Sequence, residues 1–201
     1  MAGKATASDA EDRGVGSRRR AELLDLAYRY AHDNGLADMS LRPLAAATAT
    51  SPRVLLYLFG SKDGLVREIL ARARHEQRTL VAEVVAGATA TGVEAYDDVV
   101  AALWGWLSAP QQRPTIRLFF EAYNRALQPD PGPWDGFAEE SVGDWVEILV
   151  AAQPQVGRRA ARTQAVATLA VLRGLLLHLL AGGDARQLTA ALLLTTSRGR
   201  R

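Results

Sequence analysis

SLRPLAAATATSPRVLLYLFGSKDGL, residues 40–65, contains three candidate helix starts in close succession. Ser40, Ser51 and Ser61 each suit the N-cap position, because a serine hydroxyl accepts a hydrogen bond from a free backbone N–H in the first turn of a helix. Pro52 follows the second serine at the first helical position, where the N–H that proline lacks would have no partner in any case. The stretch therefore predicts two short helices and the beginning of a third.

The apolar residues of this stretch recur at helical spacing. Leu55, Leu58 and Phe59 fall on one face of the second helix. Its opposite face carries Pro52, Arg53, Leu56 and Tyr57. Two short helices with a tight joint at residues 48–50, and a basic residue facing outward from the second, are typical of the helix-turn-helix that reads the DNA major groove.

The order of these residues resembles the N-terminal DNA-binding domain of the TetR family of bacterial transcriptional regulators. The resemblance covers about residues 18–69 and is carried by Leu44, Ala45, Ser51, Leu55, Tyr57, Phe59, Lys62 and Leu65. It implies a homodimer whose two helix-turn-helix units bind a palindromic operator in double-stranded DNA, most often as a repressor.

Two positions depart from the family pattern. Ala49 stands in the turn, where glycine is usual, and Leu56 stands where tyrosine is common. A left-handed backbone at Ala49 would cost about 1 kcal/mol. These departures keep open a second function, a ligand-binding helical protein that has lost operator binding. A transcriptional activator is a further alternative.

The outward face and the resemblance together give a set of candidate DNA contacts. Arg53 is expected to read a guanine edge or to hold a phosphate. By resemblance, Tyr57 and Lys62 are expected to anchor phosphates, and Leu56 is suited to touch a thymine methyl group. The predicted DNA-binding residues are Arg42, Thr50, Ser51, Pro52, Arg53, Leu56, Tyr57 and Lys62.

The chain is predicted to be all-α, because helical patterns follow one another and no hairpin signal interrupts them. Outside the quoted stretch, helices are predicted at 18–33, 62–86, 93–108, 113–127, 134–152, 158–181 and 185–196. Residues 1–17 are polar and predict a disordered arm, neither a signal peptide nor a membrane anchor. A three-helix helix-turn-helix domain at 18–66 and a larger effector-binding and dimerisation domain at 67–201 complete the predicted organisation.

Residues 165–180, AVATLAVLRGLLLHLL, are apolar almost all round. A membrane span needs about 20 such residues, and Arg173 and His178 interrupt this run. Burial by other helices is the better interpretation, and a second subunit is the economical way to complete it. Leu176 is expected in that subunit contact, and residues 185–194 are expected to complete a four-helix bundle across a twofold axis.

Composition excludes several classes of protein. The 201 residues are 48% hydrophobic, which excludes general disorder, and they include no cysteine, which excludes disulfides and thiolate metal sites. His32, His75 and His178 are scattered without metal-ligand spacing. No catalytic residues, cofactor or metal site is predicted, so a helical enzyme is the least favoured class, and the protein is expected in the cytoplasm.

Aromatic residues gather in the predicted C-terminal domain. A few polar residues among aromatic ones are the usual lining of a small-molecule site. The predicted ligand-binding residues are Trp104, Arg117, Phe120, Tyr123, Asn124 and Trp145. The expected effector is a small lipophilic molecule whose entry tilts the 62–86 helix and changes the spacing of the two DNA-reading units. Ordinary core packing is the alternative interpretation of the same residues.

Overall fold

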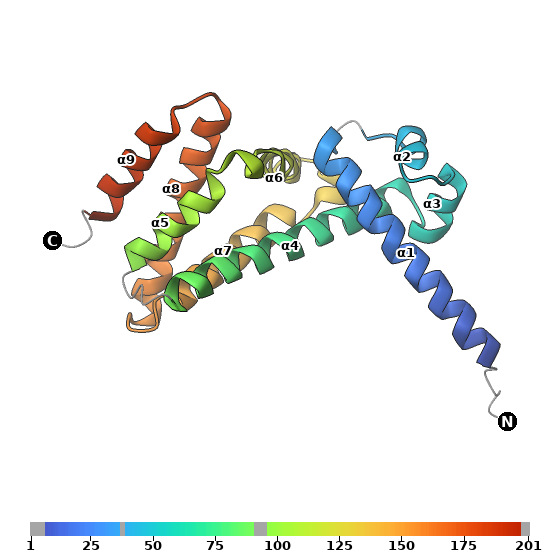
Figure 1. The fold of residues 1–201 in the computed structure, drawn as a ribbon, viewed down its shortest axis with the longest axis horizontal. Helices are drawn as coiled ribbons and strands as arrows, with labels where there is room; N and C mark the ends of the chain where they lie inside the picture. The colour runs from blue at the N-terminus through green and yellow to red at the C-terminus, as the bar shows by residue number, and fades with distance from the viewer. Residues whose placement is uncertain (1–6, 37–38, 91–95, 198–201) are drawn as a thin grey trace.

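The computed structural model describes residues 7–36, 39–90 and 96–197, and every regular element within these ranges is helical. The elements are α1 (Ala7–Asn34), α2 (Leu41–Ala47), α3 (Pro52–Phe59), α4 (Lys62–Ala90), α5 (Tyr96–Leu107), η1 (Pro110–Gln112), α6 (Arg113–Ala126), η2 (Gly132–Trp134), α7 (Phe137–Ala151), α8 (Arg158–Leu180) and α9 (Ala185–Ser197). The all-α prediction is confirmed. Helices α1 to α3 lie at one end of the molecule, α5, α8 and α9 lie at the other, and the long α4 runs between them (Figure 1).

Several element boundaries differ from the sequence prediction, and α4, for example, ends at Ala90 instead of 86. Helix α1 begins at Ala7, so the prediction of a disordered arm is wrong for residues 7–17, while residues 1–6 lie outside the described residues. Residues 7–17 contain no proline, and their alanine, glutamate and arginine favour a helix. The prediction of disorder rested instead on the polarity of the stretch. Helix α7 begins at Phe137 instead of 134, because Gly136 has a positive φ of 75° and separates it from η2.

Two hydrophobic cores hold the fold together. The first joins α1, α2, α3 and the start of α4 to Leu118 and Ala122 of α6, together with Trp134 and Phe137. The second joins the end of α4 to α5, α7, α8 and α9 and includes Ile116 of α6. Helices α4 and α6 therefore contribute to both cores, so a shift of either helix changes the packing at both ends of the molecule.

The inner face of α8 packs into the second core. Ala165, Leu169, Leu172, Leu176 and Leu179 are buried there, at the spacing that an α-helix of about 3.6 residues per turn requires. Leu176 is only 6% exposed, so the prediction that it lies in a subunit contact is wrong. The following residue, Leu177, is 51% exposed and points away from this core.

Helix α8 is also the one helix among the described residues that is long and apolar enough to cross a membrane by length and composition. Of the most apolar 18-residue segment of this helix, 33% is buried inside the protein. Core helices of soluble proteins pass the same test, so this property alone does not indicate a membrane protein.

Candidate nucleic-acid interface and effector cavity

The turn between α2 and α3 has a left-handed backbone at Ala49, whose φ is 48°. It is the only described residue other than glycine with a positive φ. On either side of it, the Thr48 hydroxyl donates to the Leu44 carbonyl at 2.8 Å, and the Thr50 N–H donates to the Ala45 carbonyl at 2.9 Å. The turn therefore adopts the strained conformation expected for a helix-turn-helix, and local hydrogen bonds hold it there.

Capping side chains and glycine define the ends of α3. The Ser51 hydroxyl accepts a hydrogen bond from the Val54 N–H at 3.2 Å, and the Ser61 hydroxyl accepts one from the Gly64 N–H at 2.9 Å. Gly60, with a φ of 77°, ends the helix, and its N–H donates to the Leu56 carbonyl at 2.9 Å. Ser40 occupies the N-cap of α2 in an extended conformation, but its hydroxyl makes no capping hydrogen bond.

The two faces of α3 separate as the apolar spacing predicts. Leu55 and Phe59 are buried against the first core, whereas Tyr57 is 86% exposed and Leu56 is 41% exposed. Of the predicted DNA-binding residues, Pro52 and Thr50 are half-buried, and those exposed are Arg42, Ser51, Arg53, Leu56, Tyr57 and Lys62. One surface thus presents two arginines, a lysine, a phenol and two hydroxyls, which is a chemistry suited to phosphates and base edges.

Arg20 of α1 supports α3 from behind, a role that sequence reasoning missed. Its Nε donates to the Leu58 carbonyl at 3.2 Å, its guanidinium pairs with Glu68 of α4, and its Cζ lies 5.1 Å from the centroid of the Phe59 ring. One side chain therefore links α1, α3 and α4. Leu58, Phe59 and Glu68 are each 38 or more positions away from Arg20 in the sequence, so no local pattern indicates these contacts.

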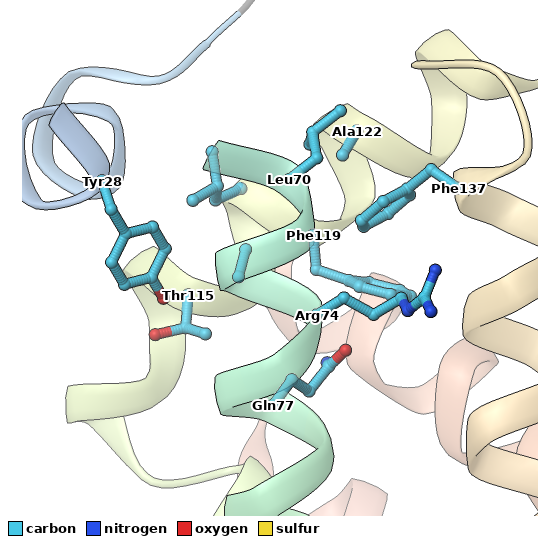
Figure 2. Close-up of a pocket in the computed structure, with 10 residues that line it drawn as sticks. Tyr28, Leu70, Arg74, Gln77, Thr115, Phe119, Ala122 and Phe137 are labelled. Atoms are coloured by element: carbon cyan, nitrogen blue, oxygen red, sulfur yellow. The ribbon is translucent and has the colours of Figure 1, made fainter. Parts of the chain in front are cut away.

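A first cavity lies between α1, α4, α6 and the start of α7 (Figure 2). Its volume is about 20 Å³, room for roughly one water molecule, within about 330 Å³ of space that includes open solvent. Tyr28, Arg74, Gln77 and Phe119 are among its lining side chains. Burial, reinforced by the neighbouring Glu76, raises the pKa of Tyr28 to about 12, so the phenol is neutral at ordinary pH.

A second cavity adjoins the first on the α8 side and also has a volume of about 20 Å³, within about 330 Å³ of space that includes open solvent. Gln77 and Phe119 line both cavities, so these two side chains form the partition between them. The second cavity is otherwise lined by Leu107, Ile116, Trp145, Leu169, Leu172, Arg173 and Leu176. It is an apolar chamber whose two polar side chains are an amide and a guanidinium.

The six predicted ligand-binding residues do not come together around one cavity. Trp145 lines the second cavity, and the Tyr123 ring packs against Arg173 with 4.6 Å between the ring centroid and Cζ. Trp104 lies in the second core, where its indole N–H donates to the Thr189 hydroxyl at 2.8 Å. Phe120 packs against the same core, and Arg117 and Asn124 are exposed.

Of the residues that line the second cavity, only Trp145 is among the predicted ligand-binding residues, and the polar lining residues Gln77 and Arg173 are not. Gln77 carries no distinguishing signal, because its neighbours in sequence are ordinary helix residues, whereas Phe119 belongs to the aromatic residues that gather in the predicted C-terminal domain. Arg173 does carry one: a single arginine inside the apolar run 165–180 has to find a partner or a cavity if that run is buried.

Polar contacts connect the cavity region to the helix-turn-helix. On α6, the Thr115 hydroxyl lies 2.9 Å from His32 Nε2 of α1, and the Glu121 carboxylate accepts a hydrogen bond from the Leu36 N–H at 3.0 Å. Phe119 lies between these two contacts on the same helix. A displacement of Phe119 therefore acts on the helix that holds the end of α1.

Ion pairs hold α4 against α7 beside the cavities. Arg74 pairs with Glu140 and with Asp144, with 2.9 Å from Arg74 Nε to Asp144 Oδ2, and Arg78 Nη1 lies 3.4 Å from Asp144 Oδ1. No group of three or more metal-ligating side chains occurs among the described residues.

A strained turn, a capped second helix with an outward polar face, and a helical body with cavities define a helix-turn-helix protein with an appended helical domain. Residues 23–69 match the family model described as bacterial regulatory proteins, tetR family. A search of curated protein sequences gave no match.

Solved structures of similar fold extend the comparison beyond the matched residues. A transcriptional regulator from Rhodococcus sp. Rha1 is 18% identical, with a TM-score of 0.72 over 89% of this chain and 94% of that one. The multidrug binding protein EbrR complexed with proflavin is 27% identical, with a TM-score of 0.62 over 87% and 97% of the two chains. A TetR-family member from Streptomyces coelicolor A3 is also 27% identical, with a TM-score of 0.58 over 87% and 95%.

The matched domain and the shared fold agree with each other. The chain carries a TetR-family helix-turn-helix DNA-binding domain, and its overall fold is that of TetR-family transcriptional regulators. The resemblance seen in residues 18–69 is confirmed.

Proposed function

We propose that this chain is a ligand-responsive transcriptional repressor that acts in the cytoplasm as a homodimer on a palindromic operator. The observation that carries the proposal is the outward face of α3, where Arg53, Leu56 and Tyr57 are exposed although the same helix buries Leu55 and Phe59. A guanidinium, a phenol and an apolar side chain on the outward face of a capped helix suit phosphates and base edges, and double-stranded DNA is the partner that we propose for this face.

The exposed residues divide by role. Arg53 reads a guanine edge or holds a phosphate, and Leu56 contacts a thymine methyl group. Tyr57 and Lys62 bind phosphates and set the register on the duplex. Arg42, Thr50, Ser51 and Pro52 complete the interface at the joint between the two helices.

The homodimer is supported by the outer face of α8. Val166 and Leu177 are each 51% exposed and lie on one face of the helix, eleven residues apart. The exposed Ala170 and Gly174 lie between them, so a second helix can approach closely. Leu193 and Leu194 of α9 add further exposed apolar surface. A second copy of the chain, packed on this face as in a four-helix bundle, would cover it and would place two reading helices on one duplex.

The effector site is proposed at the two adjoining cavities. A ligand there displaces Phe119 and Gln77, and the contacts of α6 with α1 and of α4 with α7 carry the change to the DNA-binding helices. The neighbour EbrR, a multidrug binding protein complexed with proflavin, supports a small effector in a protein of this fold.

A gel-shift titration with the upstream region of the chain's own gene tests the proposal. Wild-type protein should retard this DNA at concentrations that leave a scrambled duplex free. Arg53→Ala should reduce the affinity, whereas Arg125→Ala, which removes an exposed arginine at the far end of α6, should not. Equal binding of both duplexes, or equal loss with both variants, would exclude sequence-specific reading by α3.

A further inference from the structure

Arg173 is a half-buried cation that forms no ion pair among the described residues. Its side chain leaves α8 in the middle of the apolar run and lines the second cavity. Its Nη2 atom is buried and has no hydrogen-bond partner. Among the described residues, none of the ion pairs involves Arg173.

Two aromatic rings partly compensate for this isolation. The guanidinium Cζ lies 4.6 Å from the centroid of the Tyr123 ring and 5.4 Å from that of Phe119. Such contacts stabilise a cation. A side-chain hydrogen bond with Tyr123 adds to them, but the buried Nη2 still has no hydrogen-bond partner. Burial lowers the pKa of Arg173, and the neighbouring Tyr123 partly offsets this shift. The guanidinium nevertheless stays charged, because an arginine does not deprotonate in a protein at ordinary pH.

The rest of the cavity defines what a partner of Arg173 has to look like. Leu107, Ile116 and Leu169 present only apolar surface, and Gln77 is the other lining residue of this cavity with a strongly polar side chain. An inorganic anion would leave the apolar surface uncovered. An apolar molecule without charge would leave the guanidinium unpaired in a drier environment, which is costly.

We infer that the effector is a lipophilic organic anion, an apolar body with one acidic group, which pairs with Arg173 and accepts a second hydrogen bond from the Gln77 amide. The planar guanidinium offers two parallel N–H donors to a carboxylate or sulfonate. The inference rests on the proposed effector site and adds the charge of the ligand to it. It also separates this chain from proteins of the same fold that hold cationic dyes, since a cation would meet a like charge at Arg173.

A matched pair of fluorescent probes tests the inference without DNA. The sulfonate 8-anilinonaphthalene-1-sulfonate and the neutral N-phenyl-1-naphthylamine share one aromatic skeleton and differ in the acidic group. Titrations of the whole chain should show the sulfonate binding about tenfold or more tightly than the neutral probe. The cationic dye proflavin should bind weakest of the three.

Three variants assign the preference to one side chain. Arg173→Met should abolish the preference for the sulfonate and leave the neutral probe within about threefold of its wild-type affinity. Arg173→Lys, which keeps the charge, should retain most of the preference, and Arg125→Met should behave as wild type. The melting temperature of Arg173→Met should not fall, because the substitution removes a half-buried charge that forms no ion pair among the described residues.

The possible failures point to different parts of the account. Tight binding of the neutral probe with no preference for the sulfonate would overturn the anionic effector and leave the cavity intact. Binding of neither probe would overturn the effector site itself. A sulfonate preference that survives in Arg173→Met would remove Arg173 from the site, and a Tm loss in both Arg173 variants would return it to a purely structural role.

Discussion

The helix-turn-helix and the cavity region are built by contacts of very different range. In the helix-turn-helix, Ser51 caps Val54, Ser61 caps Gly64 and Thr48 bonds Leu44, so each contact spans three or four residues. In the second cavity, Gln77, Phe119, Trp145 and Arg173 come from four helices. Local chemistry fixes the proposed DNA-reading surface, whereas the proposed ligand surface depends on how the helices pack.

Each region also keeps one unfavourable feature at its proposed working surface. The left-handed Ala49 carries backbone strain of about 1 kcal/mol in the turn that sets the angle of α3. Arg173 carries an unpaired charge in the cavity. A feature that folding alone would remove is a good indicator of function, and here the two lie at the two ends of the proposed coupling.

The largest expected effect separates buried from exposed surface on α8. Leu176→Ala should lower the free energy of unfolding by about 2–5 kcal/mol, because it opens a hole in the second core. Leu177→Ala should change it by less than about 1 kcal/mol in the monomer, since half of that side chain already faces solvent. Denaturant titrations at several protein concentrations give both values.

A charged substitution at Leu177 tests the proposed dimer. Leu177→Arg should shift the sedimenting species toward monomer, because it places a charge in the proposed contact. A wild-type chain that sediments as a monomer at micromolar concentration would contradict the four-helix bundle.

The next effect separates base reading from phosphate binding in the helix-turn-helix. Arg53→Ala should cost about 1–3 kcal/mol of operator binding and relax the preference at one position in each half-site. Lys62→Ala should weaken binding to all sequences alike and make the dependence on salt shallower. Anisotropy titrations at several salt concentrations distinguish the two. Identical salt slopes for wild type and Lys62→Ala would remove Lys62 from the interface.

A smaller effect tests the capping serines. Ser51→Ala should destabilise the fold by about 1 kcal/mol, because its hydroxyl caps the Val54 N–H. Ser40→Ala should cost less than about 0.5 kcal/mol, because the Ser40 hydroxyl makes no capping bond. Thermal or urea unfolding of the two variants measures the difference, and equal losses would show that position alone, without the hydrogen bond, decides the contribution.

The smallest effect concerns the strained turn. Ala49→Gly should stabilise the chain by about 0.5–1 kcal/mol, because glycine accepts a positive φ without strain. Ala46→Gly, at an exposed position of the regular helix α2, should destabilise it by a similar amount. Urea unfolding should show changes in the free energy of unfolding of opposite sign for the two variants. Destabilisation by both substitutions would contradict the left-handed turn.

The difference in contact range explains which parts of the fold and of the candidate site could be predicted from the sequence. The helix-turn-helix was predictable because serine caps, Pro52, Gly60 and the spacing of Leu55 and Phe59 act within a few residues. Helix α8 was predictable as a helix, but Leu176, which was expected to face a second subunit, is buried in the second core and its neighbour Leu177 is exposed. An almost uniformly apolar run carries little information about which side faces the core. The sequence does not show whether an aromatic side chain lines a cavity or packs in the core. Trp104 and Trp145 were therefore both predicted to bind ligand, although Trp145 lines the second cavity and Trp104 packs in the second core.

The most direct test of the central claim is to select binding sites from a pool of random DNA duplexes with the wild-type chain. A protein that reads DNA through α3 as a twofold dimer should enrich a palindromic sequence, with two half-sites about one helical turn apart. The same selection with Arg53→Ala should lose information at one position of each half-site. Enrichment of no sequence, or of a site without twofold symmetry, would contradict the account of this chain as a homodimeric, sequence-specific regulator.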